Sequence, residues 1–251
     1  MGSQGGISQV PDLEQYLSGE KLYGDDFTES QIEAWYQEES EGYANLGAKD
    51  KEGYRYYYHT LNELHGFRFL AGRTYDRVLG FGSAYGLEFL PLAAKIKKLT
   101  IIDSSEAFRQ ETVCGIPCDF VRSSPTGRLP FEDASFDMLT CLSVLHHLPN
   151  VTYIVRELHR TLAHGGIALM REPVVSMGDW SSLRGGLTAR ERGIPVRLLR
   201  KIIAEAGFRT LRESFCVFPP VPRLAKRIGI AAFNNRLLTR LDAMICNALR
   251  W

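Results

Sequence analysis

A short apolar strand that runs into a glycine-containing turn constrains the fold of this 251-residue chain more than any other feature. Residues 78–86 read Val-Leu-Gly-Phe-Gly-Ser-Ala-Tyr-Gly, and a helix-like apolar pattern follows from Leu87. Such a turn lets the backbone approach a nucleotide-like ligand at the carboxyl end of a parallel strand. The spacing of Gly80, Gly82 and Gly86 differs from the dinucleotide fingerprint, and no Lys-Ser/Thr pair follows as in a Walker A loop. The turn therefore favours a nucleoside ligand without a pyrophosphate.

Strand-like and helix-like segments alternate after this turn. Helical patterns cover 153–163 and 196–206, and a glycine close behind each pattern ends it. This alternation predicts an α/β fold with a doubly wound, mostly parallel sheet, whose ligand lies at the carboxyl ends of the strands. A seventh strand is not evident. The predicted strands are 77–81, 99–103, 119–122, 136–142, 166–171 and 210–218.

Three parts of different composition make up the predicted domain organisation. Residues 1–66 are expected to form a helical N-terminal extension or lid, 67–219 the cofactor-binding core, and 220–251 a basic amphipathic helical tail. A capping box at Thr28–Gln31 opens the first long helix of the extension. A second predicted helix carries Tyr54, Tyr57, Tyr58, Leu61 and Leu64 on one side.

The two ends of the chain carry opposite charges, although its net charge is only +1. Residues 1–53 hold twelve acidic and three basic side chains, and residues 184–251 hold fourteen basic and four acidic ones. Either the two ends neutralise each other across the fold, or the basic end meets an anionic substrate or a membrane surface. For the terminal helix, packing on the domain or on a second subunit of a homodimer is favoured over a membrane surface. The small overall charge gives no reason to expect a nucleic-acid partner.

The cysteines and the absence of long apolar runs indicate a cytoplasmic protein. Cys114 and Cys118 have neither a second pair nor a nearby histidine cluster to complete a zinc site, so no metal is expected and the thiols are predicted to be free. The sequence shows no secretory signal pattern and no run of eighteen apolar residues. We therefore expect a soluble chain without an integral membrane segment.

The strongest functional signal lies at residues 129–150, which read Leu-Pro-Phe-Glu-Asp-Ala-Ser-Phe-Asp-Met-Leu-Thr-Cys-Leu-Ser-Val-Leu-His-His-Leu-Pro-Asn. This stretch resembles the class I S-adenosylmethionine-dependent methyltransferases, especially the type 11-like group that acts on small molecules. The pattern of that group is LPF-x-D-x-SFD, then an apolar strand, then LHHL. Leu162-Ala163-His164-Gly165-Gly166 continues the likeness, which spans roughly residues 76–210. The resemblance implies a Rossmann-like methyltransferase fold with S-adenosylmethionine as the cofactor.

Cofactor contacts follow from the resemblance at individual positions. It implies that Asp103, the acid at the tip of the second strand, holds the ribose, as such carboxylates do in nucleotide-binding sheets. It also implies that Ser104 lies beside the adenine, and that Leu142 and Ser143 flank the cofactor at the tip of the fourth strand. The turn that would line the methionine portion consists of Gly82, Ser83, Ala84 and Gly86, with Gly80 at the end of the strand.

The turn departs from the family pattern at two positions. The family often has an acid where this chain has Gly80, and a glycine where it has Ala84. We expect Ala84 to be tolerated if its φ angle is negative. Glu88 either replaces the missing acid or lies on the surface of the following helix, and the surface is the favoured interpretation.

His146 and His147 follow the fourth strand, where the resemblance places the reactive methyl group. Methyl transfer requires alignment of the acceptor, the methyl carbon and the sulfur, and a hydroxyl acceptor benefits from a base with a pKa near the working pH. Both histidines are therefore catalytic candidates. For His146, a role in catalysis or substrate contact and a structural role are both open. For His147, a structural hydrogen-bonding role is the favoured alternative.

Substrate-binding candidates come from three regions. Arg171 ends the fifth strand, where it either pairs with a carboxylate or phosphate of the substrate or forms an ordinary salt bridge with Glu172 or the N-terminal extension. Trp180 belongs to a polar loop over the same edge. The tyrosines of the N-terminal extension either close a lid over the substrate or pack in the core. The candidates among them are Tyr36, Tyr43 and Tyr57.

These features predict a methyltransferase that uses S-adenosylmethionine and acts on a small molecule. O-methylation of a hydroxylated metabolite or sugar-containing precursor is favoured, and N-methylation is an alternative. A second alternative is a cofactor-binding but catalytically silent protein that acts in assembly or regulation, which Gly80, Ala84 and the missing seventh strand favour. A nicotinamide-dependent oxidoreductase does not fit the glycine spacing or the lack of an evident Tyr-x-x-x-Lys pair.

Overall fold

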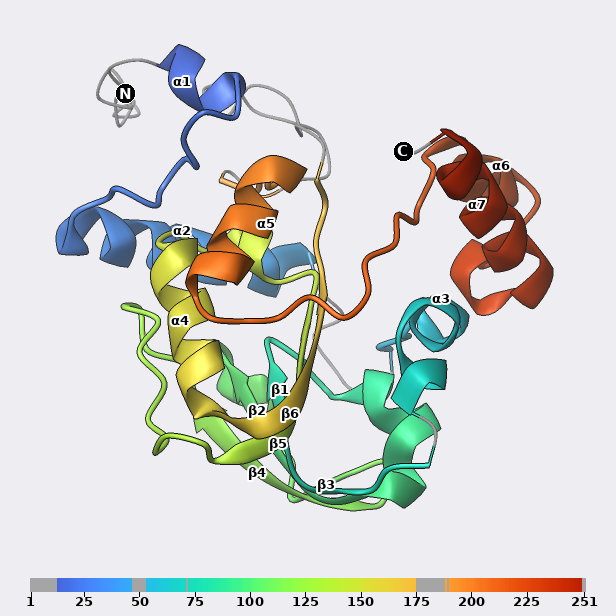
Figure 1. Ribbon diagram of the computed structural model, residues 1–251, viewed down its shortest axis with the longest axis horizontal. Coiled ribbons are helices and arrows are strands. Elements are labelled where there is room, and N and C mark those ends of the chain that lie inside the picture. The colour runs from blue at the N-terminus through green and yellow to red at the C-terminus, as the bar shows by residue number, and fades with distance from the viewer. Residues whose placement is uncertain (1–12, 47–52, 71, 175–187, 189, 250–251) are drawn as a thin grey trace.

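A six-stranded sheet with helices on both faces forms the centre of the protein (Figure 1). The computed structural model describes residues 13–46, 53–70, 72–174, 188 and 190–249. The strand order is β3-β4-β2-β1-β5-β6, in which β3 is antiparallel to β4 and every other pairing is parallel. This arrangement confirms the predicted α/β class. The strands are β1 (Tyr75–Phe81), β2 (Ile96–Asp103), β3 (Thr112–Val113), β4 (Ile116–Arg122), β5 (Phe136–Leu142) and β6 (Leu162–Arg171).

Helices precede, connect and follow these strands. The α-helices are α1 (Leu13–Leu17), α2 (Glu29–Leu46), α3 (His59–His65), α4 (Val151–Thr161), α5 (Val196–Glu205), α6 (Pro220–Arg227) and α7 (Arg236–Leu249). The 3-10 helices are η1 (Phe67–Leu70), η2 (Leu87–Lys95), η3 (Glu106–Phe108), η4 (Leu145–His147) and η5 (Ala232–Asn234). None of the described helices is both long and apolar enough to cross a membrane.

The core has two layers because successive residues of a buried strand point to opposite faces of the sheet. Val78 packs with the aromatic and aliphatic side chains of η1 and η2 on one face. Its neighbour Leu79 packs with α4 and α5 on the other face. Each of these two strand residues is 0% exposed, which explains why β1 is an almost continuous apolar run in the sequence.

The N-terminal helix α2 crosses the carboxyl ends of two strands. One of the two bonds of the predicted capping box is present, because the Gln31 side chain accepts the backbone N–H of Thr28 at 2.9 Å. One turn later, the Trp35 indole donates to the carbonyl of His147 just beyond β5, at 2.7 Å. The Tyr36 hydroxyl donates to the carbonyl of Ser123, just beyond β4, at 3.2 Å. These contacts place α2 over the edge of the sheet where a ligand is expected.

Two local predictions were wrong. The second N-terminal helix begins only at His59, and residues 54–58 are irregular because their tyrosines turn to different partners. Tyr54 packs on Tyr85, whereas Tyr58 stacks on Phe233. Residues 210–218 form no strand, because Asp242 of α7 accepts the N–H groups of Val217 and Phe218 at 2.8 and 2.7 Å. The C-terminal end of this segment is therefore hydrogen-bonded to α7 rather than to β6.

The contacts of Asp242 predict how the C-terminal helices are held. The side chain is 0% exposed, and each of its two backbone hydrogen bonds to a charged acceptor contributes about 1.5–3 kcal/mol. We expect Asp242→Ala to lower the opening free energy of amides in 217–249 by about 2–4 kcal/mol, measured by native-state hydrogen exchange. Asp76→Ala is the control, since that carboxylate pairs with Lys97 at the surface. Unchanged protection in α7 of Asp242→Ala would contradict this account.

Candidate functional site

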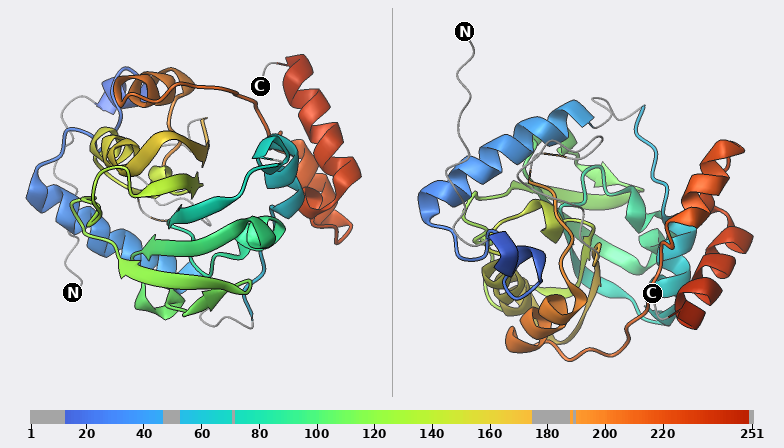
Figure 2. Two further views of the ribbon diagram at one scale, coloured as in Figure 1. Left: turned by 60° about the horizontal axis from the view of Figure 1, so that its bottom comes forward. Right: turned by 90° about the horizontal axis from the view of Figure 1, so that it is seen from above.

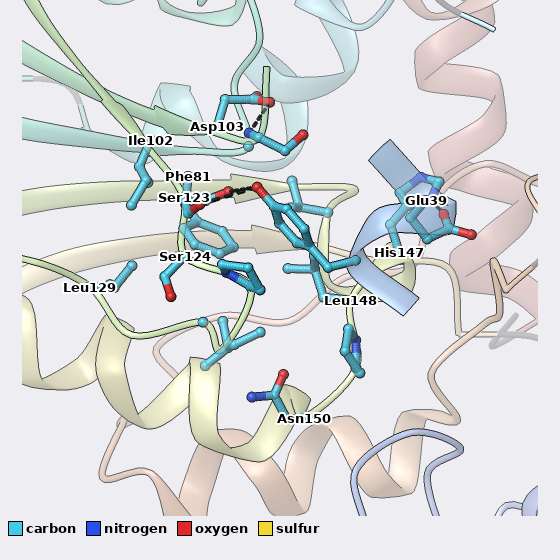
Figure 3. A pocket seen from close by; sticks show the side chains of 18 of the residues that line it. Glu39, Phe81, Ile102, Asp103, Ser123, Ser124, Leu129, His147, Leu148 and Asn150 are labelled. Carbon is cyan, nitrogen blue, oxygen red and sulfur yellow. Dashed lines mark hydrogen bonds and ion pairs between the residues drawn. The ribbon is translucent and has the colours of Figure 1, made fainter. Parts of the chain in front are cut away.

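A pocket of about 100 Å³ lies at the carboxyl ends of β1, β2, β4 and β5 (Figure 3). Parallel strands of a doubly wound sheet bring their following loops together at this edge. The pocket therefore collects residues far apart in sequence, including several polar groups. Those lining it include Tyr36, Glu39, Gly82, Asp103, Ser104, Ser123, Ser143 and His147.

Asp103 ends β2 and presents a buried carboxylate to the pocket. The side chain accepts the N–H of Ala84 at 2.9 Å and that of Ser104 at 2.7 Å. Burial raises the pKa of Asp103 above its ordinary value, and these backbone N–H groups oppose that rise. The carboxylate thus joins the turn after β1 to the end of β2 and still has acceptor capacity for a ligand.

The turn after β1 touches the turn after β5. A Cβ added to Gly82 would lie 2.5 Å from Cγ1 of Val144, so a side chain there would push the two turns apart. Ala84 has φ of +47°, not the negative angle that the sequence interpretation required. This left-handed conformation costs an alanine roughly 1–2 kcal/mol. The hydrogen bond from its N–H to Asp103 helps to hold it.

His147 and Glu39 form an ion-pair-like contact at the side of the pocket (Figure 3). Nδ1 of His147 lies 3.1 Å from Oε2 of Glu39. Glu39 also accepts the hydroxyl of Thr188 at 2.6 Å and the N–H of Arg190 at 3.0 Å. Burial raises the pKa of the Glu39 carboxyl, but the hydrogen bonds from His147, Thr188 and Arg190 outweigh it and hold the pKa below its ordinary value. An ionised Glu39 suits a His147 that carries its proton on Nδ1 and leaves Nε2 as an acceptor.

His146 is buried behind this pair and does not line the pocket. Its Nδ1 lies 2.8 Å from Glu172 and its Nε2 lies 3.6 Å from Glu191, so both ring nitrogens face a carboxylate. Burial lowers the pKa of His146, but the contacts with Glu172 and Glu191 outweigh it and raise the pKa to about 9. A histidine that is protonated at neutral pH and enclosed in this way serves as a structural cation.

Glu172 organises the turn that carries both histidines. Its carboxylate is 0% exposed and accepts the N–H groups of Val144 and Leu145, each at 2.9 Å, and that of His146 at 3.3 Å. From the other side, Arg192 donates to the carbonyl of His146 at 3.0 Å and to that of Leu148 at 2.8 Å. The backbone of η4 is thereby fixed from both sides.

Glu88 is a second buried acid near the turn after β1. It is 4% exposed, which overturns the favoured surface interpretation. Burial raises the pKa of Glu88 to about 7, although a hydrogen bond with the Ser83 side chain and the charge of Arg171 both lower it. The Ser83 hydroxyl oxygen lies 2.5 Å from where a Cβ at Gly80 would stand. Ser83 therefore occupies the space of the side chain missing at position 80 and connects it to Glu88.

Arg171 ends β6 and meets polar groups rather than Glu172. Its guanidinium donates to the hydroxyl of Ser143 at 3.2 and 3.3 Å and to the side-chain oxygen of Asn62 at 2.5 Å. It also lies 4.5 Å from the ring centroid of Tyr58. Within the described residues, no carboxylate is within ion-pair distance of Arg171, so its charge is available to an anionic group.

One cluster in the described residues has the composition of a metal site. Ligand atoms of His146, His147 and Glu191 lie within 4.8 Å of one another. Protonated His146 carries an N–H on each ring nitrogen, one facing Glu172 and the other facing Glu191, so neither nitrogen has a lone pair for a metal ion. The hydrogen-bonded interpretation therefore accounts for these side chains.

Comparisons with known proteins place this geometry in a family. A family model described as a methyltransferase domain matches residues 79–170, from β1 to β6. The uncharacterized methyltransferase YcgJ of Bacillus subtilis (strain 168) is 30% identical over 105 residues, which cover 39% of this chain and 41% of that protein. Residues 79–170 are therefore similar to the methyltransferase domain family. The chain thus spans about two fifths of the length of this curated relative.

Solved structures show the same methyltransferase fold at low sequence identity. The [4+2]-cyclase SpnF superposes with a TM-score of 0.52 and 21% identity, covering 76% of this chain and 74% of that one. The methyltransferase bound to the Trm112 activator of Haloferax volcanii gives a TM-score of 0.52 and 15% identity, covering 77% and 82%. Since one neighbour is a cyclase, the methyltransferase fold alone does not determine the reaction.

The structure brings some predicted site residues together and separates others. Gly82, Asp103, Ser104, Ser143, Tyr36 and His147 line the pocket, whereas Leu142 and Arg171 line the neighbouring groove beside β6. Gly80, Ser83, Ala84 and Gly86 are buried in and around the turn after β1. Tyr57 is 55% exposed and does not line the pocket. Trp180 and the side chain of Tyr43 lie outside the described residues.

Sequence reasoning missed the acids that support the site. Glu39 lies in an acidic run of α2, and no pattern distinguishes it from its exposed neighbours. Glu191 and Arg192 come from the segment before α5 and meet the histidines only in the folded chain. For Glu172 the available signal was its place directly after β6, at the ligand edge of the sheet.

The enclosed His146 predicts a pH-dependent stability. Its pKa is about 9 in the folded chain against 6.5 for an unperturbed group, so its stabilisation is complete below pH 6.5 and is lost as the pH rises through 9. The stabilisation is about 3 kcal/mol. In urea unfolding, we expect the free energy of unfolding of the parent to fall over that pH range by roughly this amount more than that of His146→Gln. His164→Gln, which alters an exposed histidine, is the control and should follow the parent. Parallel pH profiles for the parent and His146→Gln would contradict the assignment.

Proposed function

We propose that this chain transfers the methyl group of S-adenosylmethionine to a hydroxyl group of a small molecule. The observation that carries the proposal is that His147, backed by the ionised Glu39, lines the same pocket as Asp103. A base and a ribose-binding carboxylate thus belong to one site. Hydroxylated metabolites and sugar-containing precursors have the acceptor that such a base assists.

The donor and acceptor groups of the pocket fit the cofactor. Asp103 is a buried acceptor suited to a ribose diol, and Ser104 and Ser123 add hydroxyl groups beside it. At about 100 Å³ the pocket is smaller than the 300–1,000 Å³ usual for ligand sites. Tyr36, whose hydroxyl lies 3.1 Å from that of Ser123, closes it on one side. We infer that Tyr36 moves aside when the cofactor enters and then covers it, as a lid would.

Two opposite charges near the turn after β1 suit the amino-acid tail of the cofactor. Among the described residues Glu88 has no cationic hydrogen-bond partner, and burial raises its pKa to about 7 although the charge of Arg171 lowers it. An ammonium group supplies the missing positive charge. Arg171, held by Ser143 and Asn62, suits a carboxylate. We assign Glu88 the part that the family's acid plays where this chain has Gly80.

The proposed reaction requires the protein to align the acceptor with the methyl carbon and the sulfur and to remove a proton from the acceptor. When bound, S-adenosylmethionine supplies a methyl group on a positively charged sulfur. Nε2 of His147 accepts the hydroxyl proton as the acceptor oxygen attacks, and Glu39 stabilises the imidazolium that forms. Trp35 and Arg192 hold the backbone of the turn, so the imidazole keeps its position. The proposal therefore assigns the base to His147 and a structural charge to His146.

A second candidate is a protein of this fold that binds the cofactor without transferring its methyl group. The left-handed Ala84 and the absence of an acid at position 80 favour it, and the cyclase SpnF shows that a methyltransferase fold serves another reaction. Incubation with a small-molecule extract and methyl-labelled S-adenosylmethionine distinguishes the two, because only a methyltransferase forms a labelled product. A methylated amine in place of a methyl ether would identify an N-methyltransferase.

Cofactor recognition is tested by calorimetry with two ligands. S-adenosylmethionine carries the amino-acid tail, whereas 5′-methylthioadenosine lacks it. We expect Glu88→Gln to weaken binding of the first about 10–100-fold and to leave the second unchanged, because one charge-assisted contact is lost. Glu63→Gln, an exposed acid of α3, is the control. If neither ligand binds the parent at millimolar concentration the cofactor is wrong, and equal binding by Glu88→Gln rejects only the role of Glu88.

Catalysis by His147 is tested on whichever labelled product the parent forms. We expect His147→Gln to reduce kcat about 10²–10⁴-fold while affinity for S-adenosylmethionine stays within a few-fold, because the base acts on the acceptor. Glu39→Gln should lower kcat less and shift the pH–rate profile, since it changes the partner of the imidazole. A His147→Gln rate within a few-fold of the parent would remove His147 as the base.

A further inference from the structure

The C-terminal hairpin of α6, η5 and α7 buries one set of apolar side chains against α3 and carries a second set on its outer side. In α7 the buried positions are Thr239, Asp242 and Cys246, each 0% exposed. On the opposite side of the helix, at i, i+4 and i+7, lie Leu237, Leu241 and Met244, which are 76%, 45% and 69% exposed. Leu238 and Ile245 pack inward as well, so α7 is apolar on both sides, whereas a helix that only covers a domain keeps its outer side polar. The outer stripe therefore needs a partner of its own.

The same hairpin exposes further apolar groups. Leu224 is 59% exposed and Ile228, one turn later, is 71% exposed. Of the fourteen large apolar side chains exposed among the described residues, seven lie within residues 220–249. Single exposed apolar residues are ordinary, but this concentration in one small element marks an interaction surface.

The charges on this surface have one sign. The single acid of the segment, Asp242, is buried and bound to backbone N–H groups of residues 217 and 218. The basic residues are all exposed, and none forms an ion pair among the described residues. They are Arg223, Lys226, Arg227, Arg236 and Arg240. The surface is thus apolar and positive.

We propose that the α6–α7 hairpin binds the surface of an anionic phospholipid membrane. Leucine, isoleucine and methionine side chains enter the boundary between headgroups and acyl chains, while arginine and lysine contact lipid phosphates. The helices lie along the membrane, since none of the described helices spans one. Figures 1 and 2 show the hairpin beside α3, on the side of the molecule away from α2. The acidic N-terminal helices consequently lie away from the anionic surface.

A second copy of the chain fits this surface less well. Exposed acidic residues that could match its charge include those of α1 and α2, where the described exposed side chains are polar apart from Leu17 and Ala34. The acidic surface of α1 and α2 would pair with the arginines but would leave Leu237 and Met244 without an apolar partner of similar size. A lipid bilayer satisfies both requirements at once.

Vesicle flotation tests the proposal with the protein as it is. The probes are vesicles of phosphatidylcholine alone and of phosphatidylcholine mixed equally with phosphatidylglycerol. We expect the parent to float with the mixed vesicles, at least about ten-fold more weakly with the neutral ones, and less well at high salt. Absence of flotation with the mixed vesicles at low salt would overturn the proposal.

Matched variants separate the two parts of the surface. Leu237→Gln/Met244→Gln should weaken flotation about ten-fold or more, and Arg236→Gln/Arg240→Gln should also remove much of the salt dependence. Leu90→Gln changes an equally exposed leucine on η2, 58% exposed, and should bind like the parent. Circular dichroism melting confirms that each variant is folded. Flotation of Leu237→Gln/Met244→Gln equal to the parent's overturns the proposal, as does a dimer in light scattering that this variant abolishes, which would assign the surface to a second copy.

Discussion

The buried carboxylate of Glu172 is the interaction on which the candidate site depends. It accepts three successive backbone N–H groups at the start of η4 and pairs with the ring of His146. An uncompensated carboxylate at this depth would cost several kcal/mol, so the turn can form only with these partners in place. The position of His147, one residue further on, follows from that constraint. A carboxylate outside the pocket thus helps to fix the position of the histidine that lines it.

Charge balance explains why so many ionisable groups tolerate burial together. Three acids, Glu39, Glu172 and Glu191, lie close to the histidine turn, and Arg192, 0% exposed, lies beneath it. Burial lowers the pKa of Arg192 to about 10, which still leaves it charged at neutral pH. With His146 protonated as well, the positive charges offset much of the negative charge without solvent. The remaining acid, Glu39, is stabilised by hydrogen bonds and stays ionised beside His147.

Sequence patterns with a regular period could be predicted, and contacts between distant elements could not. The alternation of apolar residues located β1, β2, β4, β5 and β6. The motif at 129–150 predicted the similarity to a methyltransferase domain that the family model finds over residues 79–170. Asp103 was predictable because a strand end is a fixed place in this fold. Residues 210–218 have the alternation of a strand, but a buried acid 24 residues later ties the end of the segment to α7. Glu39 and Glu88 carry no local signal, since only tertiary packing separates them from exposed acids.

The strained turn after β1 gives the Asp103 carboxylate a second role. Ala84 adopts a left-handed backbone that an alanine avoids, and its N–H donates to the Asp103 carboxylate. The group proposed to hold the ribose is therefore also a group that holds the strained turn. Asp103 is buried and its pKa is raised, so neutralising it would weaken the turn as well as the ligand contact. Binding to Asp103 and the shape of the turn are then coupled, because any ligand that stabilises the ionised carboxylate also strengthens its hold on Ala84.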